Sequence, residues 1–173
     1  MEFSKNDKLL KILFTVVLFL SFLAIGSFKL NEDPALNQDE MAFALGADNI
    51  SQTGYDLCGS KFPLFPCALS EFPYRSTTIS YYGSALFYKF YVPGTIFDIR
   101  IFSVLLGALA GVFSLLLFYR LFEKTKNGFA YAAILAIIFY FSPAFFTIQR
   151  FAAPYFILSV LLQMALFYYC HSG

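Results

Sequence analysis

Two neighbouring carboxylates, Asp39 and Glu40, are the side chains of this sequence that are best placed for acid–base chemistry. They stand at the start of a predicted helix, because Asn37 and Glu40 have the spacing of a capping box and Gly54 is a suitable helix end. Spacings of three and four residues place Asp39 on an otherwise apolar face of that helix. This face is formed by Leu36, Phe43, Ala47 and Ile50.

A carboxylate on an apolar face must be neutralised, paired or used in catalysis. We therefore take Asp39 as a candidate catalytic residue that lines a cavity. The alternative is an acid near the start of a helix, a position that the helix dipole favours. Glu40 is expected to point away from the apolar face, where a capping role suits it, and it enters the candidate site as the neighbour of Asp39.

Three arginines are candidates for binding an anion beside this helix. Arg75 precedes a predicted interfacial helix and could bind a phosphate, or its side chain could extend to lipid headgroups. Arg100 opens a hydrophobic run, where a cation opposes the helix dipole, so we expect an anionic partner, either Asp98 or a bound phosphate. Arg150 lies between two apolar runs and is either interfacial or directed into a site.

The composition is typical of an integral membrane protein rather than a soluble one. Of the 173 residues, 59% are hydrophobic and 13% are charged, and the net charge of +1 does not indicate a nucleic-acid partner. The sequence contains no glycine-rich phosphate loop and no group of residues with the spacing of a metal site. No metal is therefore required, and a divalent metal stays an open alternative.

Four hydrophobic runs predict an all-α membrane fold with about four transmembrane helices. They cover approximately residues 10–29, 99–121, 128–147 and 152–171 of a single membrane domain over residues 1–173. Pro143 is expected to kink or end the third helix, and the Gly107-x-x-x-Gly111 motif suggests close packing along the second. The first run could instead be a cleaved signal peptide, with a small-residue site at Ala24-Ile25-Gly26.

The connection over residues 30–98 is too long to be structureless, so we expect two juxtamembrane helices in it, near residues 37–53 and 76–91. Basic residues precede the first hydrophobic run and follow the second, which places both flanks and the N-terminus in the cytoplasm and the long connection outside it. These residues are Lys5, Lys8, Lys11, Arg120, Lys124 and Lys126. Cys58 and Cys67, in the outer segment, could form a disulfide or remain two separate thiols.

Several short motifs resemble the N-terminal part of the GT-C glycosyltransferases, in particular the family 39 group of protein mannosyltransferases and aminoarabinose transferases. The resemblance covers about residues 8–160. The motifs are Asp39-Glu40, Thr53-Gly54-Tyr55-Asp56 with Gly59 and Pro63, Phe97-Asp98-Ile99-Arg100, Ser142-Pro143 and Gln149-Arg150.

This resemblance implies a multi-pass enzyme of the plasma or inner membrane that works on the outer side. The donor would be a sugar linked to a polyprenyl phosphate, and the acceptor a hydroxyl group of a protein, lipid or glycan. The resemblance assigns the general base to Asp39, with Glu40 as its neighbour, and lipid-phosphate binding to Arg75 and Arg150. Arg100 joins them as a lipid-phosphate candidate from its position alone.

The chain departs from this family in two respects. An acidic residue often follows the arginine that corresponds to Arg150, where this chain has Phe151-Ala152-Ala153-Pro154. Family members also continue for many more spans, so we expect a fragment that holds the acceptor side of the site and is inactive on its own. The alternative class is a non-catalytic scaffold or transporter subunit, although a transporter should carry charges near the middle of its spans and these runs carry charges only near their ends.

Overall fold

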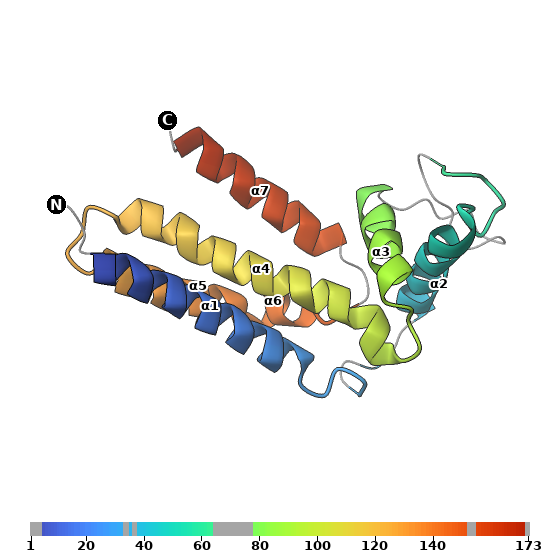
Figure 1. Cartoon of the computed structure of the whole chain (residues 1–173), viewed down its shortest axis with the longest axis horizontal. Helices are drawn as coiled ribbons and strands as arrows, with labels where there is room; N and C mark the ends of the chain where they lie inside the picture. Colours follow the sequence, from blue (N-terminus) through green and yellow to red (C-terminus); the bar gives the residue numbers. More distant parts are fainter. Residues whose placement is uncertain (1–4, 33–34, 36–37, 64–77, 152–154, 172–173) are drawn as a thin grey trace.

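The computed structural model describes residues 5–32, 35, 38–63, 78–151 and 155–171, and in this part of the chain the regular structure is helical. Five helices form an elongated bundle and two form a pair at one of its ends (Figure 1). The bundle contains α1 (Lys5–Ser27), α4 (Ile96–Phe122), α5 (Gly128–Tyr140), α6 (Pro143–Ile148) and α7 (Tyr155–His171). The end pair is α2 (Gln38–Thr53) and α3 (Thr78–Phe90).

Helix α4 is the centre of the bundle, in contact with α1, α5 and α7. The predicted glycine seam is present on α4, because a Cβ atom at Gly111 would lie only 2.7 Å from the ring of Phe22 in α1 and 2.9 Å from the ring of Tyr140 in α5. The two rings stack with centroids 3.9 Å apart, and the Tyr140 hydroxyl donates to the carbonyl of Phe22. The glycine therefore lets three helices meet at close range.

The break expected at Pro143 is confirmed. Helix α5 ends at Tyr140, and Pro143 begins the short helix α6. Proline is tolerated in the first turn of a helix because the amide there has no partner within the helix. Of the kink or end expected at this proline, the end is observed, and the predicted span over residues 128–147 consists of two helices separated by a turn.

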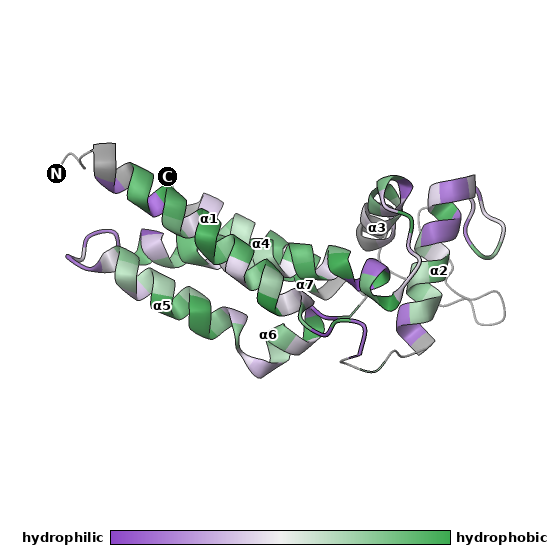
Figure 2. Ribbon diagram, turned by 60° about the horizontal axis from the view of Figure 1, so that its bottom comes forward, coloured by the Kyte–Doolittle hydropathy of each residue, from purple (hydrophilic) through white to green (hydrophobic). Residues whose placement is uncertain are grey.

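Within the described ranges, two helices are long and apolar enough to cross a membrane, namely α1 over Leu9–Ser27 and α4 over Ile96–Phe122. The apolar stretches of α5 and α7 are shorter, covering Gly128–Tyr140 and Ile157–Tyr169. Figure 2 shows hydrophobic residues along most of these four helices, with hydrophilic residues in α2 and in the connection between α4 and α5. The all-helical fold is thus confirmed, whereas the count of four spans stays a prediction.

Helices α2 and α3 confirm the two helices expected in the long connection, with slightly different bounds. Their interface is aromatic: Tyr81 of α3 lies against Phe43 of α2, with ring centroids 4.4 Å apart. Gly46 makes room for this contact, since a Cβ atom there would lie 2.8 Å from the Tyr81 ring. Gly54 ends α2 as expected, with φ of +76° and an amide that donates to the carbonyl of Ile50.

Candidate functional site

A buried ion pair joins the end pair of helices to the bundle. Arg100 of α4 donates from Nε to Oε1 of Glu40 at 2.9 Å and from Nη2 to Oε2 at 2.8 Å, while its Nη1 donates to the carbonyl of Leu30 at 3.0 Å. The side chains are 0% and 1% exposed. We call these three groups the Glu40–Arg100 clamp. It fixes the first turn of α2 on α4 and on the segment that follows α1.

The clamp corrects the expected roles of the two neighbouring carboxylates. Glu40, expected to point away from the core, is the buried one, whereas Asp39, expected to line a cavity on the apolar face, is exposed. The buried face of α2 contains Glu40, Phe43, Ala47 and Ile50. Phe43 is four residues after Asp39 and three after Glu40, so either acid continues the stripe at helical spacing. The guanidinium of Arg100 selects Glu40.

The structure also changes the expected partner of Arg100. The anionic partner expected for Arg100 is present, but it is Glu40 rather than Asp98 or a lipid phosphate, because the guanidinium is fully buried and donates to protein acceptors. Asp98 instead accepts from the amide and hydroxyl of Thr95 at 2.7 and 2.8 Å and forms a capping box with it. The Thr95-x-x-Asp98 spacing is the sequence signal that identifies this cap, and it accounts for the start of α4.

Arg150 lies directly after α6 and is only 5% exposed. Its Nη1 donates to the carbonyl of Gly26 at 3.3 Å, and its guanidinium lies 5.4 Å from the ring centre of Phe146. Gly26 stands in the last turn of α1, where carbonyl groups lack partners within the helix and a cation is favoured. The side chain is therefore buried within the protein, and its direction into a functional site stays a prediction. Whether Arg150 also binds a lipid phosphate stays a prediction.

The glutamine next to Arg150 was missed by the sequence reading as a site residue. Gln149 is 0% exposed, and neither polar atom of its amide has a hydrogen-bond partner in the described part of the chain. It packs on the other glycine of the seam, since a Cβ atom at Gly107 would collide with its Oε1. In the sequence, the only indication that Gln149 matters was its place beside the arginine in the Gln149-Arg150 motif.

Two expected site features fall partly or wholly outside the described residues. Arg75 lies within residues 64–77, so its phosphate-binding role stays a prediction. Cys58 is part of a disulfide. Its expected partner, Cys67, is outside the described range, so the pairing of these two cysteines stays a prediction as well.

The motif around Asp56 forms a tight turn after α2. Asp56 is 3% exposed, and its Oδ1 accepts from the amides of Cys58 at 3.1 Å and Ser60 at 2.7 Å. Gly59, at φ of +82°, supplies the left-handed conformation that this turn requires. The acid therefore serves to build the turn. Among the described residues, no three His, Cys, Asp or Glu side chains come together as a metal site would require.

The arrangement thus places one exposed carboxylate, Asp39, beside a rigid buried ion pair at the end of an apolar bundle. Such a carboxylate is accessible to other molecules and can accept a proton. Comparison with known proteins finds no family model, no curated protein and no solved structure that matches this chain.

Proposed function

We propose that this chain belongs to a membrane glycosyltransferase that takes a sugar from a polyprenyl-phosphate-linked donor, with Asp39 as its general base. The proposal combines the motif resemblance with the position of Asp39 in the fold. The observation that carries it is the Glu40–Arg100 clamp, which holds the first turn of α2 against the bundle. Successive residues on a helix are about 100° apart. Because Glu40 is fixed toward the bundle, Asp39 is held in one position on the exposed side of α2.

The chemistry is a single displacement at the sugar. Asp39 accepts the proton of the acceptor hydroxyl, and the resulting nucleophile attacks the anomeric carbon of the donor. The bond from that carbon to the phosphate oxygen breaks, and polyprenyl phosphate leaves with the electron pair, so the configuration inverts. Cationic side chains near the departing phosphate lower the barrier by offsetting its charge. Arg75 and Arg150 are the candidates for that role.

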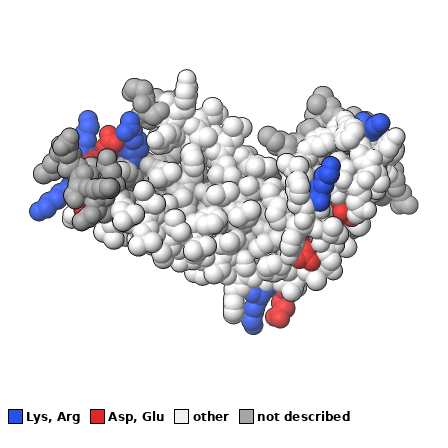
Figure 3. Space-filling view, in the orientation of Figure 1, with Lys and Arg blue, Asp and Glu red and all other residues white. Residues whose placement is uncertain are grey.

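The protein is proposed to be a multi-pass membrane protein. A helix that spans the hydrocarbon core needs about 20 residues. Helix α5 has 13 residues, so α5 and α6 would cross together, with the turn before Pro143 inside the protein bundle. The charge distribution supports this placement, because in Figure 3 charged side chains gather at the two ends of the molecule and at its lower edge toward the α2–α3 end, and the broad face between these groups is white.

The test is sugar transfer by the full-length protein in membranes, assayed with polyprenyl phosphates that carry mannose, glucose or aminoarabinose. Asp39→Asn should lower turnover by about 10²- to 10⁴-fold, the contribution of a general base. Its folding should be unchanged because Asp39 is exposed. Glu32→Gln is the matched control, since it removes an exposed acid from the segment between α1 and α2 without changing the proposed base.

Two outcomes would contradict the proposal. Full transfer activity in Asp39→Asn would show that Asp39 is not the general base. No transfer by the wild-type protein with any of the three donors, together with unchanged assembly of the membrane proteins around it, would favour the scaffold class instead.

A further inference from the structure

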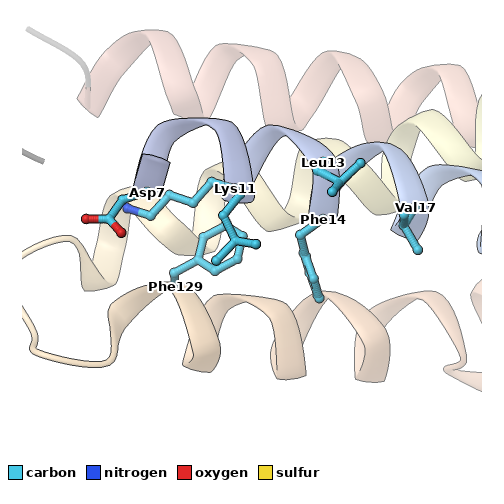
Figure 4. A pocket seen from close by; sticks show the side chains of 7 residues that line it. Asp7, Lys11, Leu13, Phe14, Val17 and Phe129 are labelled. Carbon is cyan, nitrogen blue, oxygen red and sulfur yellow. The ribbon is translucent and has the colours of Figure 1, made fainter. Parts of the chain in front are cut away.

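A groove of about 490 Å³ lies on the outside of the bundle between α1 and α5, far from α2 and α3. Its long walls are apolar and come mainly from Leu13, Phe14 and Val17 of α1 and Phe129 of α5. Figure 4 shows Phe14 pointing from α1 toward α5. The rings of Phe14 and Phe129 meet edge to face with centroids 5.4 Å apart. The floor of the groove is therefore closed, and its open side faces the surroundings of the bundle.

One end of this groove carries two opposite charges, those of Asp7 and Lys11. They are four residues apart on α1 and so lie on the same face of the helix. Lys11 is held in place by the bundle: Nζ donates to the hydroxyl of Tyr119 at 2.9 Å and lies 4.8 Å from the centre of that ring. The ends of the two side chains lie near each other at the mouth of the groove (Figure 4).

An apolar channel that ends in one cation and one anion is complementary to a particular kind of amphiphile. Its chain must be apolar, and its head must carry an anion and a hydrogen-bonding cation close together. We propose that the groove binds a phospholipid with a primary-amine headgroup, of the phosphatidylethanolamine type. Lys11 faces the phosphate, Asp7 faces the ammonium, and one acyl chain lies against Phe14 and Phe129.

Charge complementarity favours this headgroup over the other common ones. A phosphatidylglycerol head would match Lys11 but would bring a negative charge near Asp7. A phosphatidylcholine head has no N–H group to donate to the Asp7 carboxylate. The same end of the molecule also carries three exposed cations, Arg120 in the last turn of α4 and Lys124 and Lys126 in the connection after it. These attract anionic lipids in general, so the test must separate a surface effect from binding in the groove.

The inference rests on the membrane location proposed above but not on sugar transfer. It is tested by mass spectrometry of the intact protein released from detergent with phosphatidylethanolamine, phosphatidylcholine or phosphatidylglycerol of identical acyl chains. The wild-type protein should retain phosphatidylethanolamine preferentially. Asp7→Asn and Lys11→Met should each weaken its retention about tenfold, as expected for the loss of one charge-assisted hydrogen bond. Lys124→Met, which removes a nearby charge outside the groove, should leave it unchanged.

A second pair of variants tests the position of the acyl chain. Val17 and Leu20 are exposed to the same degree on α1, at 53% and 55%, but only Val17 lines the groove. Val17→Trp should fill the groove and abolish selective retention, whereas Leu20→Trp should not change it. Because both positions face outward, neither variant requires the core to rearrange.

Equal retention of the three lipids would overturn the inference, as would a preference for phosphatidylglycerol that is lost in Lys124→Met. Equal effects of Val17→Trp and Leu20→Trp would also overturn it. A wild-type protein that retains no lipid would likewise overturn it. None of these measurements uses a sugar donor, so a failure of the proposed transferase activity would be seen separately.

Discussion

The guanidinium of Arg100 donates to acceptors on two segments of the chain, the carboxylate of Glu40 and the carbonyl of Leu30. Burying two charges is costly, and good geometry with additional hydrogen bonds is needed to offset that cost. Both conditions are met here, because the pair is bidentate and a third hydrogen bond uses the remaining nitrogen. The clamp therefore fixes the position of α2 on the bundle and does not simply add to the free energy of unfolding.

Breaking this pair from one side should be strongly destabilising. In Arg100→Met the Glu40 carboxylate loses its buried cation, and the expected loss is about 3–5 kcal/mol of unfolding free energy. Unfolding by a denaturing detergent, followed by circular dichroism, measures that loss. Replacing both residues, as in Glu40→Leu with Arg100→Met, should cost less than Arg100→Met alone because no charge is then left buried.

The surface ion pair between Arg120 and Glu123 provides the control. Its two side chains are 43% and 38% exposed, and its N–O distance of 2.9 Å is similar to that of the buried pair. Arg120→Met should cost less than about 1 kcal/mol, since exposed pairs are screened by water. Equal losses in the Arg100 and Arg120 variants would show that burial of the clamp does not determine its strength.

At the scale of helices, the glycine seam of α4 sets how closely α1 and α5 approach. Gly111→Ala should destabilise the bundle by about 1–3 kcal/mol, because the added methyl group would collide with the stacked rings of Phe22 and Tyr140. Gly83→Ala is the control in α3, where the nearest atom to an added Cβ is 3.6 Å away. That variant should be neutral or stabilising, because alanine favours the helix. The unfolding midpoints of the two variants provide the measurement. An unchanged midpoint in Gly111→Ala would show that this glycine is not required for the close packing of α1, α4 and α5.

The pair of α2 and α3 should lose stability in alkali. Burial, and next the charge of Asp56, raises the pKa of Tyr81 above its usual 10.0, and burial with the charge of Asp48 does the same for the pKa of Tyr88. Below pH 10 these phenols are neutral in both the folded and the unfolded state, so their contribution to stability is fully present. As the pH rises further the unfolded state ionises first, and the contribution is progressively lost.

Tyr81→Phe should shift the alkaline transition to higher pH. The Tyr81 hydroxyl is buried and has no hydrogen-bond partner within the described residues, so its removal leaves no acceptor unsatisfied there. Circular dichroism and tyrosinate absorbance as a function of pH measure the transition. Tyr55→Phe, at an exposed position, should leave it where it is. An unchanged transition in Tyr81→Phe would show that the ionisation of this phenol is not coupled to unfolding.

The whole molecule is polarised along its length. One end carries the α2–α3 pair, and the opposite end carries the start of α1 and the connection between α4 and α5 (Figure 1). If the bundle crosses the membrane as proposed, these ends face opposite compartments. Lys124 should then be accessible from the cytoplasm and Lys61 from outside, because of the positive-inside rule. Reporter fusions or amine labelling of sealed membranes at these two lysines test this, and labelling of both from one side would contradict it.

Local sequence determined much of this architecture. The hydrophobic runs, the tyrosine-rich helix, the stop at Gly54 and the break at Pro143 follow from backbone and burial preferences of neighbouring residues, which act within a few positions. The exact division of residues 128–147 into two helices did not follow from the local sequence, because the proline allowed either a kink or an end of the helix. The cap formed by Thr95 and Asp98 is also a local signal, because the two residues are three positions apart.

Only the tertiary structure decided which of two adjacent acids is buried. Phe43 is at helical spacing from both Asp39 and Glu40, so periodicity alone cannot separate them. The choice is made by Arg100, 60 residues away from Glu40 in sequence, whose charge needs a buried anion at that place in the bundle. The hydrophobic pattern defines a helix and its approximate inner face, whereas a buried charge pairs with whichever opposite charge the packing of helices brings within reach.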